Sequence, residues 1–141
     1  MGQENLRVGE IQANTRIALG QENRKVAEAY LTAMRTRNIQ ALGHTLHPNL
    51  QVIGPTDEVH NRSSFLATMQ RVVPHLERVD VAARLASGNQ SFYMYNLVFA
   101  SPAAPLRTAH LMTHHDDGQI RKIEFVAGKA DFHTYLKSLS Q

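Results

Sequence analysis

Two side chains are candidates for acid–base or electrophilic chemistry, His110 and Tyr30. An imidazole titrates near neutral pH, so His110 could act as a general acid or base without a large pKa shift. The phenol of Tyr30, on the apolar face of a predicted helix, could donate a hydrogen bond to a carbonyl oxygen on which charge develops. Each also has a purely structural interpretation. His110 could be a core histidine bonded to a neighbouring hydroxyl or carbonyl, and Tyr30 a buried tyrosine with a partner.

Strand alternation decides which residues share a face with His110, because successive side chains of a strand point to opposite sides. The residues on its face are Leu106, Thr108, Met112 and His114. On the preceding strand one face carries Tyr93, Tyr95, Leu97 and Phe99. An aromatic stripe of this kind is typical of a core and can also orient a ligand.

The sequence predicts neither a metal site nor a cofactor. His44 and His47 stand three apart on a predicted helix, but no third ligand is adjacent. His114 and His115 are consecutive on a strand and point to opposite faces. Cysteine is absent, which excludes thiolate ligands and cysteine nucleophiles. There is no phosphate-binding glycine motif and no nucleophile elbow.

Hydrophobic periodicity predicts helices first and strands later. Apolar residues at helical spacing, with Pro48 and Pro74 as stops, give the helices. A period of two, with turns at 87–89 and 116–118, gives the later strands. The expected helices are Asn23–Arg37, Ile39–His47, Ser63–Val73 and Asp131–Leu139, and the expected strands are Leu50–Ile53, Val79–Leu85, Ser91–Ala100, Leu106–His115 and Ile120–Val126. In Val79–Leu85 the apolar face is Val79, Val81, Ala83 and Leu85. This order predicts the α+β class, with helices on one face of a curved antiparallel sheet.

The bulk properties suit one small domain. The 141 residues fit a single unit, with residues 1–22 an arm or an extra helix and 23–141 the domain. The net charge is +3 and the basic residues are scattered, which disfavours a nucleic-acid partner. No apolar run is long enough to span a bilayer, so no membrane partner is predicted. The polar start lacks a signal-peptide pattern, which makes the cytoplasm the expected location.

Three stretches resemble the nuclear transport factor 2-like superfamily, most closely its SnoaL-like branch. One is the helix with Tyr30 followed by the step at residues 38–42, Asn-Ile-Gln-Ala-Leu. Another is Val-Ile-Gly-Pro at 52–55, which leads through a loop into the helix with Phe65 and Met69. The last is Leu-Met at 111–112, running through Asp-Gly-Gln-Ile at 117–120 to Ile123 and Phe125. The resemblance covers about residues 23–126 and implies a cone-shaped sheet wrapped around the N-terminal helices.

The resemblance also implies roles for individual residues. In the related ketosteroid isomerases, a tyrosine of the first helix and an acid of a late strand hold an oxyanion, and Tyr30 and His110 fall at those positions. The isomerase base falls at Gly54, so that base is missing; Asp57 of the next loop could replace it or simply be solvated. The aromatic strand face is then inward, which predicts an apolar pocket for a small apolar molecule. Its expected ligand-binding residues are Tyr93, Tyr95, Leu97, Thr108, Met112, Phe125 and Leu46.

Three functions are compatible with such a pocket. The first is a cofactor-independent isomerase, cyclase or dehydratase that acts on a small apolar carbonyl compound. The second is a non-catalytic small-molecule-binding protein, which the missing base favours. The third is a protein-interaction module, which needs an apolar patch on the outer sheet face. The sequence shows no excess of apolar residues there, since Asn96, Arg107, Ala109 and Thr113 are expected on it, and residues of this kind suit a modest homodimer contact.

Overall fold

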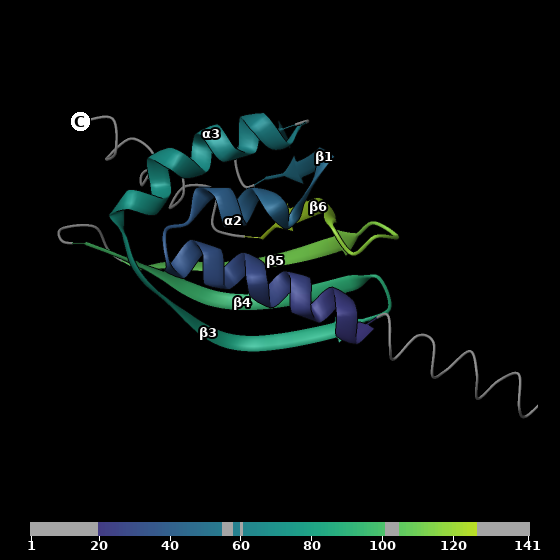
Figure 1. The fold of residues 1–141 in the computed structure, drawn as a ribbon. Coiled ribbons are helices and arrows are strands. Elements are labelled where there is room, and N and C mark those ends of the chain that lie inside the picture. The colour runs from purple at the N-terminus through teal and green to yellow at the C-terminus, as the bar shows by residue number, and fades with distance from the viewer. Residues whose placement is uncertain (1–19, 55–57, 60, 101–104, 127–141) are drawn as a thin grey trace, which may run out of the picture.

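A computed structural model describes residues 20–54, 58–59, 61–100 and 105–126 of the chain. The helices lie on one side of a six-stranded curved sheet (Figure 1), which confirms the α+β class. The helices are residues 20–35, α2 (Ile39–His44) and α3 (Arg62–Val72), with a 3-10 turn η1 (Val73–His75). The strands are β1 (Leu46–Ile53), β2 (Glu58–Val59), β3 (Leu76–Ser87), β4 (Gln90–Phe99), β5 (Leu106–His114) and β6 (Ile120–Phe125). Most of the predicted N-terminal arm and the predicted helix Asp131–Leu139 lie outside the described residues.

The sheet has the order β2-β1-β6-β5-β4-β3. Strands β3 to β6 form the predicted antiparallel meander, with short turns between β3 and β4 and between β5 and β6. The prediction of a wholly antiparallel sheet is wrong in one place, because β1 and β6 pair in parallel. The chain leaves β1 through α3 and returns through the whole meander, and this long excursion brings β6 beside β1 in the same direction.

The helices are held by an apolar face and by polar caps. Tyr30, Leu31 and Met34 of the first helix are buried against the sheet. Near its start the Asn23 side chain donates to the Gly88 carbonyl at 2.9 Å, which fastens the helix to the β3–β4 turn. Asn61 caps α3 by accepting from the Ser64 N–H at 2.8 Å. None of the helices among the described residues has the length and apolarity needed to cross a bilayer.

The predicted helix Ile39–His47 is wrong at its end, because α2 stops at His44 and β1 begins at Leu46. The Ile120 N–H donates to the Thr45 carbonyl at 2.8 Å, so pairing with β6 takes over where the helix ends. Pro48 therefore lies inside a strand and does not stop a helix. It falls in the stretch where the β1–β6 register shifts, a place where a missing backbone N–H is tolerated.

Strand β3 contains an irregularity that alternation alone does not predict. Val81 pairs with Tyr95 and Ala83 with Met94, so Ala82 is an extra residue in β3. A β-bulge of this kind reverses the facing of every later residue. The expectation that Leu85 shares the inner face of Val79 is therefore wrong, and Leu85 is 67% exposed on the outer face.

Candidate functional site

His110 lies in the middle of β5 and is fully buried within an aromatic cage. Its ring centroid is 5.8 Å from that of Tyr30, 5.7 Å from Tyr93, 5.1 Å from Tyr95 and 5.7 Å from Phe125, each in an edge-on arrangement. The rings come from the first helix, β4 and β6. The structure thus brings together the two residues predicted to be catalytic and surrounds His110 with three of the predicted ligand-binding residues.

Two polar atoms of this cage lack partners. The Tyr95 hydroxyl is hydrogen-bonded to His110 Nδ1 at 2.9 Å. Nε2 of His110 and the hydroxyl of Tyr30 are buried and have no hydrogen-bond partner among the described residues. Buried polar groups are nearly always hydrogen-bonded, and exceptions concentrate where a protein binds or reacts. When Tyr95 donates to Nδ1, the neutral imidazole carries its proton on Nε2, so both free atoms are then available donors.

Burial controls the protonation of the cage. It lowers the pKa of His110 to about 3, because the imidazolium would lie in an apolar interior. Burial likewise raises the pKa of Tyr30 and of Tyr95 above the ordinary value. The expectation that His110 titrates near neutral pH is therefore wrong. At neutral pH the site presents a neutral imidazole and neutral phenols, which donate hydrogen bonds and do not take up protons readily.

The other predicted ligand-binding residues lie in the same interior. Leu46 of β1, Leu97 of β4 and Met112 of β5 are buried, and Thr108 of β5 is buried with its hydroxyl 3.4 Å from the Leu106 carbonyl. Phe125 is half-buried. The strand register places Thr108 opposite Tyr95, and it places His110 between Tyr93 on β4 and Phe125 on β6. They form one continuous inner wall; their contact with a ligand stays a prediction.

A carboxylate at the edge of the cage was missed by the sequence reasoning. Glu28 of the first helix accepts from the Tyr93 hydroxyl at 3.2 Å and pairs with Arg84 at 2.7 Å. Burial and, secondarily, the charge of Glu28 raise the pKa of Tyr93 to about 12. Glu28 is half-buried, and nothing in its sequence neighbourhood distinguishes it from the solvated charges of the same helix. The network fixes the direction of the Tyr93 ring beside His110.

His114 also faces inward, as predicted, but it has a structural role. Its Nδ1 donates to the Gly118 carbonyl at 2.8 Å, so Nε2 of the neutral ring accepts from the Ser91 hydroxyl at 2.9 Å. Both ring nitrogens are thereby satisfied, and the pKa of His114 is lowered, chiefly by burial. This pair of bonds fastens β4 and the β5–β6 turn to β5 and leaves the ring no free atom for a ligand.

The position expected for an isomerase base has a backbone suited to glycine. Gly54 has a φ of +67°, and a Cβ built on it would lie 3.1 Å from the Phe125 carbonyl oxygen. A side chain there would meet both backbone strain and a crowded neighbour. The missing carboxylate therefore belongs to the local architecture of β1 and β6, and Asp57, the other candidate base, lies outside the described residues.

Two further side-chain sets do not form sites. His44 ends α2 and His47 lies in β1, so the helical spacing expected for them is wrong. Within the described residues no group of three or more His, Cys, Asp or Glu could hold a metal ion. Three charged residues of β3 and β5 do not come together in one set either, because each has a different partner. Arg84 pairs with Glu28, Asp80 pairs with Arg78, and Arg107 contacts Asn96 on the outer face.

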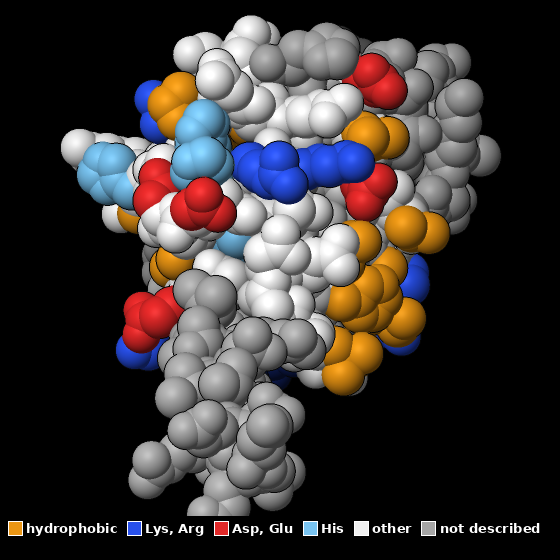
Figure 2. Space-filling view, turned by 90° about the vertical axis from the view of Figure 1, so that its right-hand side faces the viewer, with side chains coloured by type: hydrophobic (Ala, Val, Ile, Leu, Met, Phe, Trp, Pro, Cys, Tyr) orange, Lys and Arg blue, Asp and Glu red, His pale blue; other side chains and the backbone are white. Residues whose placement is uncertain are grey.

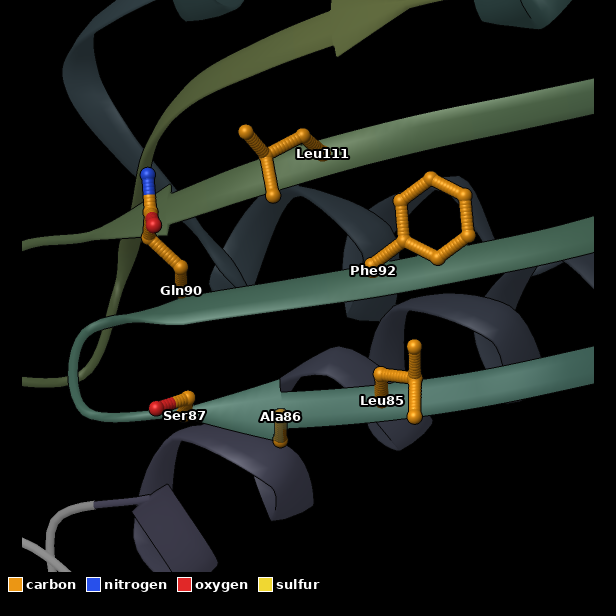
Figure 3. A pocket seen from close by; sticks show the side chains of 6 residues that line it. All are labelled: Leu85, Ala86, Ser87, Gln90, Phe92 and Leu111. Carbon is orange, nitrogen blue, oxygen red and sulfur yellow. The ribbon is translucent and has the colours of Figure 1, made fainter.

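The outer face of the sheet carries an apolar row that the sequence reasoning missed. Leu85 pairs with Phe92 across β3 and β4, and Phe92 pairs with Leu111 across β4 and β5. With Ala86, Ser87 and Gln90 they line a hollow of about 310 Å³, and Figure 3 shows the three apolar side chains on adjacent strands. The bulge at Ala82 creates the row, because without it Leu85 would point inward.

A model of the SnoaL-like domain family matches residues 27–123. The chain belongs to the SnoaL-like family. The match spans all elements described above from the first helix to β6. No curated protein is similar to the sequence.

Solved structures share the fold. An LEH-like epoxide hydrolase from M. tuberculosis superposes with a TM-score of 0.68 at 16% identity, over 86% of this chain and 94% of that one. A steroid delta-isomerase from Pseudomonas aeruginosa gives 0.66 at 16% identity, over 83% and 93%. A de novo designed protein with a curved β-sheet gives 0.72 at 13% identity, over 84% and 94%. At such low identities these TM-scores show the fold alone, and the designed protein illustrates that the fold carries no reaction by itself.

Proposed function

We propose that this SnoaL-like protein is a cofactor-independent enzyme of the isomerase, cyclase or dehydratase type that acts on a small apolar carbonyl compound. The observation that carries the proposal is that Tyr30 Oη and His110 Nε2 are both buried in one aromatic cage without a hydrogen-bond partner among the described residues. Both atoms are donors when Tyr95 donates to Nδ1 of His110. Two neutral donors in a buried, largely apolar site suit one carbonyl oxygen. They stabilise it most when negative charge develops on it, because preorganised donors in a low-dielectric site need no reorganisation.

Each residue has a distinct task in this mechanism. Tyr30 donates from the helix side and His110 from the sheet side to the substrate oxygen. Tyr95 holds Nδ1 of His110 and so keeps the proton on Nε2, which makes it a positioning residue. The apolar inner wall contributes binding energy and excludes water. Charge then forms at the oxygen as a carbon nucleophile attacks the carbonyl carbon, or as an adjacent C–H proton passes to a carboxylate base, a role for which Asp57 is the candidate in the sequence.

A second candidate function is non-catalytic binding of the same class of compound. Gly54 favours it, because a carboxylate base cannot be accommodated there without strain. Tight binding of a carbonyl compound without any product on long incubation distinguishes the binding protein from the enzyme. The same two donors would then serve only to orient the ligand.

Native mass spectrometry of the purified protein, followed by extraction of bound compounds and a screen of enones and small ketones, tests the proposal. For a compound that is turned over, we expect Tyr30→Phe and His110→Phe each to lower kcat by about 100-fold or more. The exposed residue His75 provides a matched control, and His75→Phe should leave kcat unchanged. Equal activity of wild type and His110→Phe would remove His110 from the mechanism.

The pH dependence of kcat gives an independent check. His110 has its pKa lowered to about 3 and Tyr30 has its pKa raised above the ordinary value, so neither donor titrates between pH 5 and 9. We therefore expect no inflection from these residues in that range. An inflection near pH 7 that disappears in His110→Phe would instead show that His110 transfers a proton.

A further inference from the structure

The outer face of the sheet has a polar hollow at the end that carries the β5–β6 turn. It measures about 580 Å³ and lies across β1, β6, β5 and β4. The residues that line it are His47, Asn49, Gln51, Asn89, Gln90, Thr113, His115, Arg121 and Lys122. No aspartate or glutamate is among them, while arginine, lysine and two imidazoles are. Figure 2 shows histidine side chains beside a row of Lys and Arg side chains at this end of the molecule.

Two irregularities of the sheet build this hollow. The first is between β5 and β6. Thr113 of β5 pairs with Lys122 of β6 and the next residue, His114, pairs with Ile120, so Arg121 is an extra residue in β6. It stands next to Lys122 in sequence, and the irregularity lets both cations line one hollow although regular alternation would separate them. On β1, Leu46 pairs with Ile120 and Gln51 with Lys122, so four residues of β1 stand opposite one of β6. This irregularity of β1 places His47, Asn49 and Gln51 along the same hollow.

The hollow is organised for hydrogen-bond donation. The Asn49 backbone N–H donates to Nδ1 of His47 at 3.0 Å, so the neutral ring must carry its proton on Nε2. The rings of His47 and His115 contact each other, with centroids 4.6 Å apart, which fixes β1 against the β5–β6 turn. Among the described residues Arg121 has no ion-pair partner, and Lys122 forms an ion pair with Glu124 at 3.4 Å.

We propose that this hollow is a binding site for a small multivalent oxyanion, a compound that carries phosphate or several carboxylate groups. Two adjacent cations, an imidazole N–H and side-chain amides match an anion with several acceptor oxygens, and charge-assisted bonds of this type are the strong ones. The site is separate from the His110 cage, because Thr113 and Lys122 face outward where Met112 and Ile123 face in. It does not depend on the reaction proposed above.

Isothermal titration calorimetry of the whole protein tests this site, with inorganic pyrophosphate and citrate as separate probes at an ionic strength held constant with sodium chloride. We expect saturable binding of at least one probe, and the stronger of the two identifies the kind of oxyanion. Arg121→Gln and Lys122→Gln should each weaken binding by about tenfold. Arg35→Gln changes an equally exposed arginine at the end of the first helix, on the other side of the sheet, and should change affinity by less than about twofold.

Amide chemical shifts locate the binding. With ¹⁵N-labelled protein, the probe that binds should shift the amides of Gln51, Thr113 and Lys122 along a saturation curve with the calorimetric affinity. Absence of saturable binding by both probes would overturn the proposal. So would binding that Arg35→Gln weakens as much as Arg121→Gln does, since that outcome indicates attraction by overall positive charge.

Discussion

At the scale of single residues, burial holds His110 in its neutral form, and this lowers the free energy of unfolding at acidic pH. Its pKa is about 3 in the folded protein, against an ordinary value of 6.5. Between these values the unfolded chain binds a proton at this residue and the folded chain does not. The contribution of His110 to the free energy of unfolding is therefore fully present above pH 6.5, and it is lost progressively as the pH drops toward 3. His114, whose pKa is also lowered, acts in the same direction.

We predict that the free energy of unfolding falls by up to about 1.4 kcal/mol per pH unit from His110 alone as the pH drops below 6.5. Urea unfolding of wild type and His110→Leu at pH 7.5, 6, 5 and 4 measures it. The variant should show a shallower decline than wild type. Met112→Leu, a buried apolar change in the same strand, should keep the wild-type slope. Parallel curves for wild type and His110→Leu would mean that His110 has the same pKa in the folded protein as in the unfolded chain.

The sequence identifies the types of residue in the site but not their protonation. Strand alternation places His110, Tyr93 and Tyr95 on shared faces, and the structure brings them together with Tyr30. The pKa of His110 depends on complete burial under the first helix, which is a tertiary property. The hydrogen bond that the Tyr93 hydroxyl donates to Glu28 joins residues 65 positions apart, and no local pattern indicates it.

At the scale of elements, the end of β1 excludes the side chain that an isomerase would need. Gly54 combines a φ of +67° with 3.1 Å between a built Cβ and the Phe125 carbonyl oxygen. Gly88 offers a matched comparison. Its φ is +57°, but a Cβ there would have no heavy atom of the described residues within 4 Å. A side chain at Gly88 would therefore cost backbone strain alone, whereas one at Gly54 would cost backbone strain and steric crowding.

We predict that Gly88→Ala lowers the free energy of unfolding by about 1 kcal/mol, the usual cost of a left-handed backbone. Gly54→Ala should cost about 1 kcal/mol more, because the added methyl group also displaces β6. Gly54→Asp should be at least as destabilised and should not increase turnover. Urea unfolding of the three variants checks the order. Equal losses at Gly54 and Gly88 would show that β6 yields without cost.

The element boundaries and side-chain directions that the sequence does not predict share one cause. The apolar spacing of Leu42 and Leu46 suits a continued helix, yet Leu46 pairs with Ile120 in the sheet. The facing of Leu85 and the direction of Arg121 both follow from an extra residue in a strand. Each of these outcomes depends on the partner strand, which is distant in sequence. Local periodicity predicts that the elements exist and what type they are, while their ends and facing follow from pairing.

At the scale of the whole molecule, the two faces of the sheet differ in a way that bears on assembly. The inner face is covered by the helices. Among the described residues the large hydrophobic side chains that are exposed are Leu85, at 67%, and Val126, at 70%. Leu85 lies in the outer row with Phe92 and Leu111, and Val126 follows β6 and donates its N–H to the Ala109 carbonyl. An apolar area on an otherwise solvated sheet face favours a protein contact.

We predict that the protein is a homodimer joined through this outer row, and that the oxyanion-binding hollow borders the contact at Gln90. Leu85→Arg should weaken dimerisation by more than about tenfold, because it places an unpaired charge in an apolar contact. Ala67→Arg, on the exposed surface of α3, should leave the dimer intact. Sedimentation velocity over a range of concentrations measures both. A monomeric wild type would exclude the homodimer, whereas a dimer unaffected by Leu85→Arg would place the contact elsewhere.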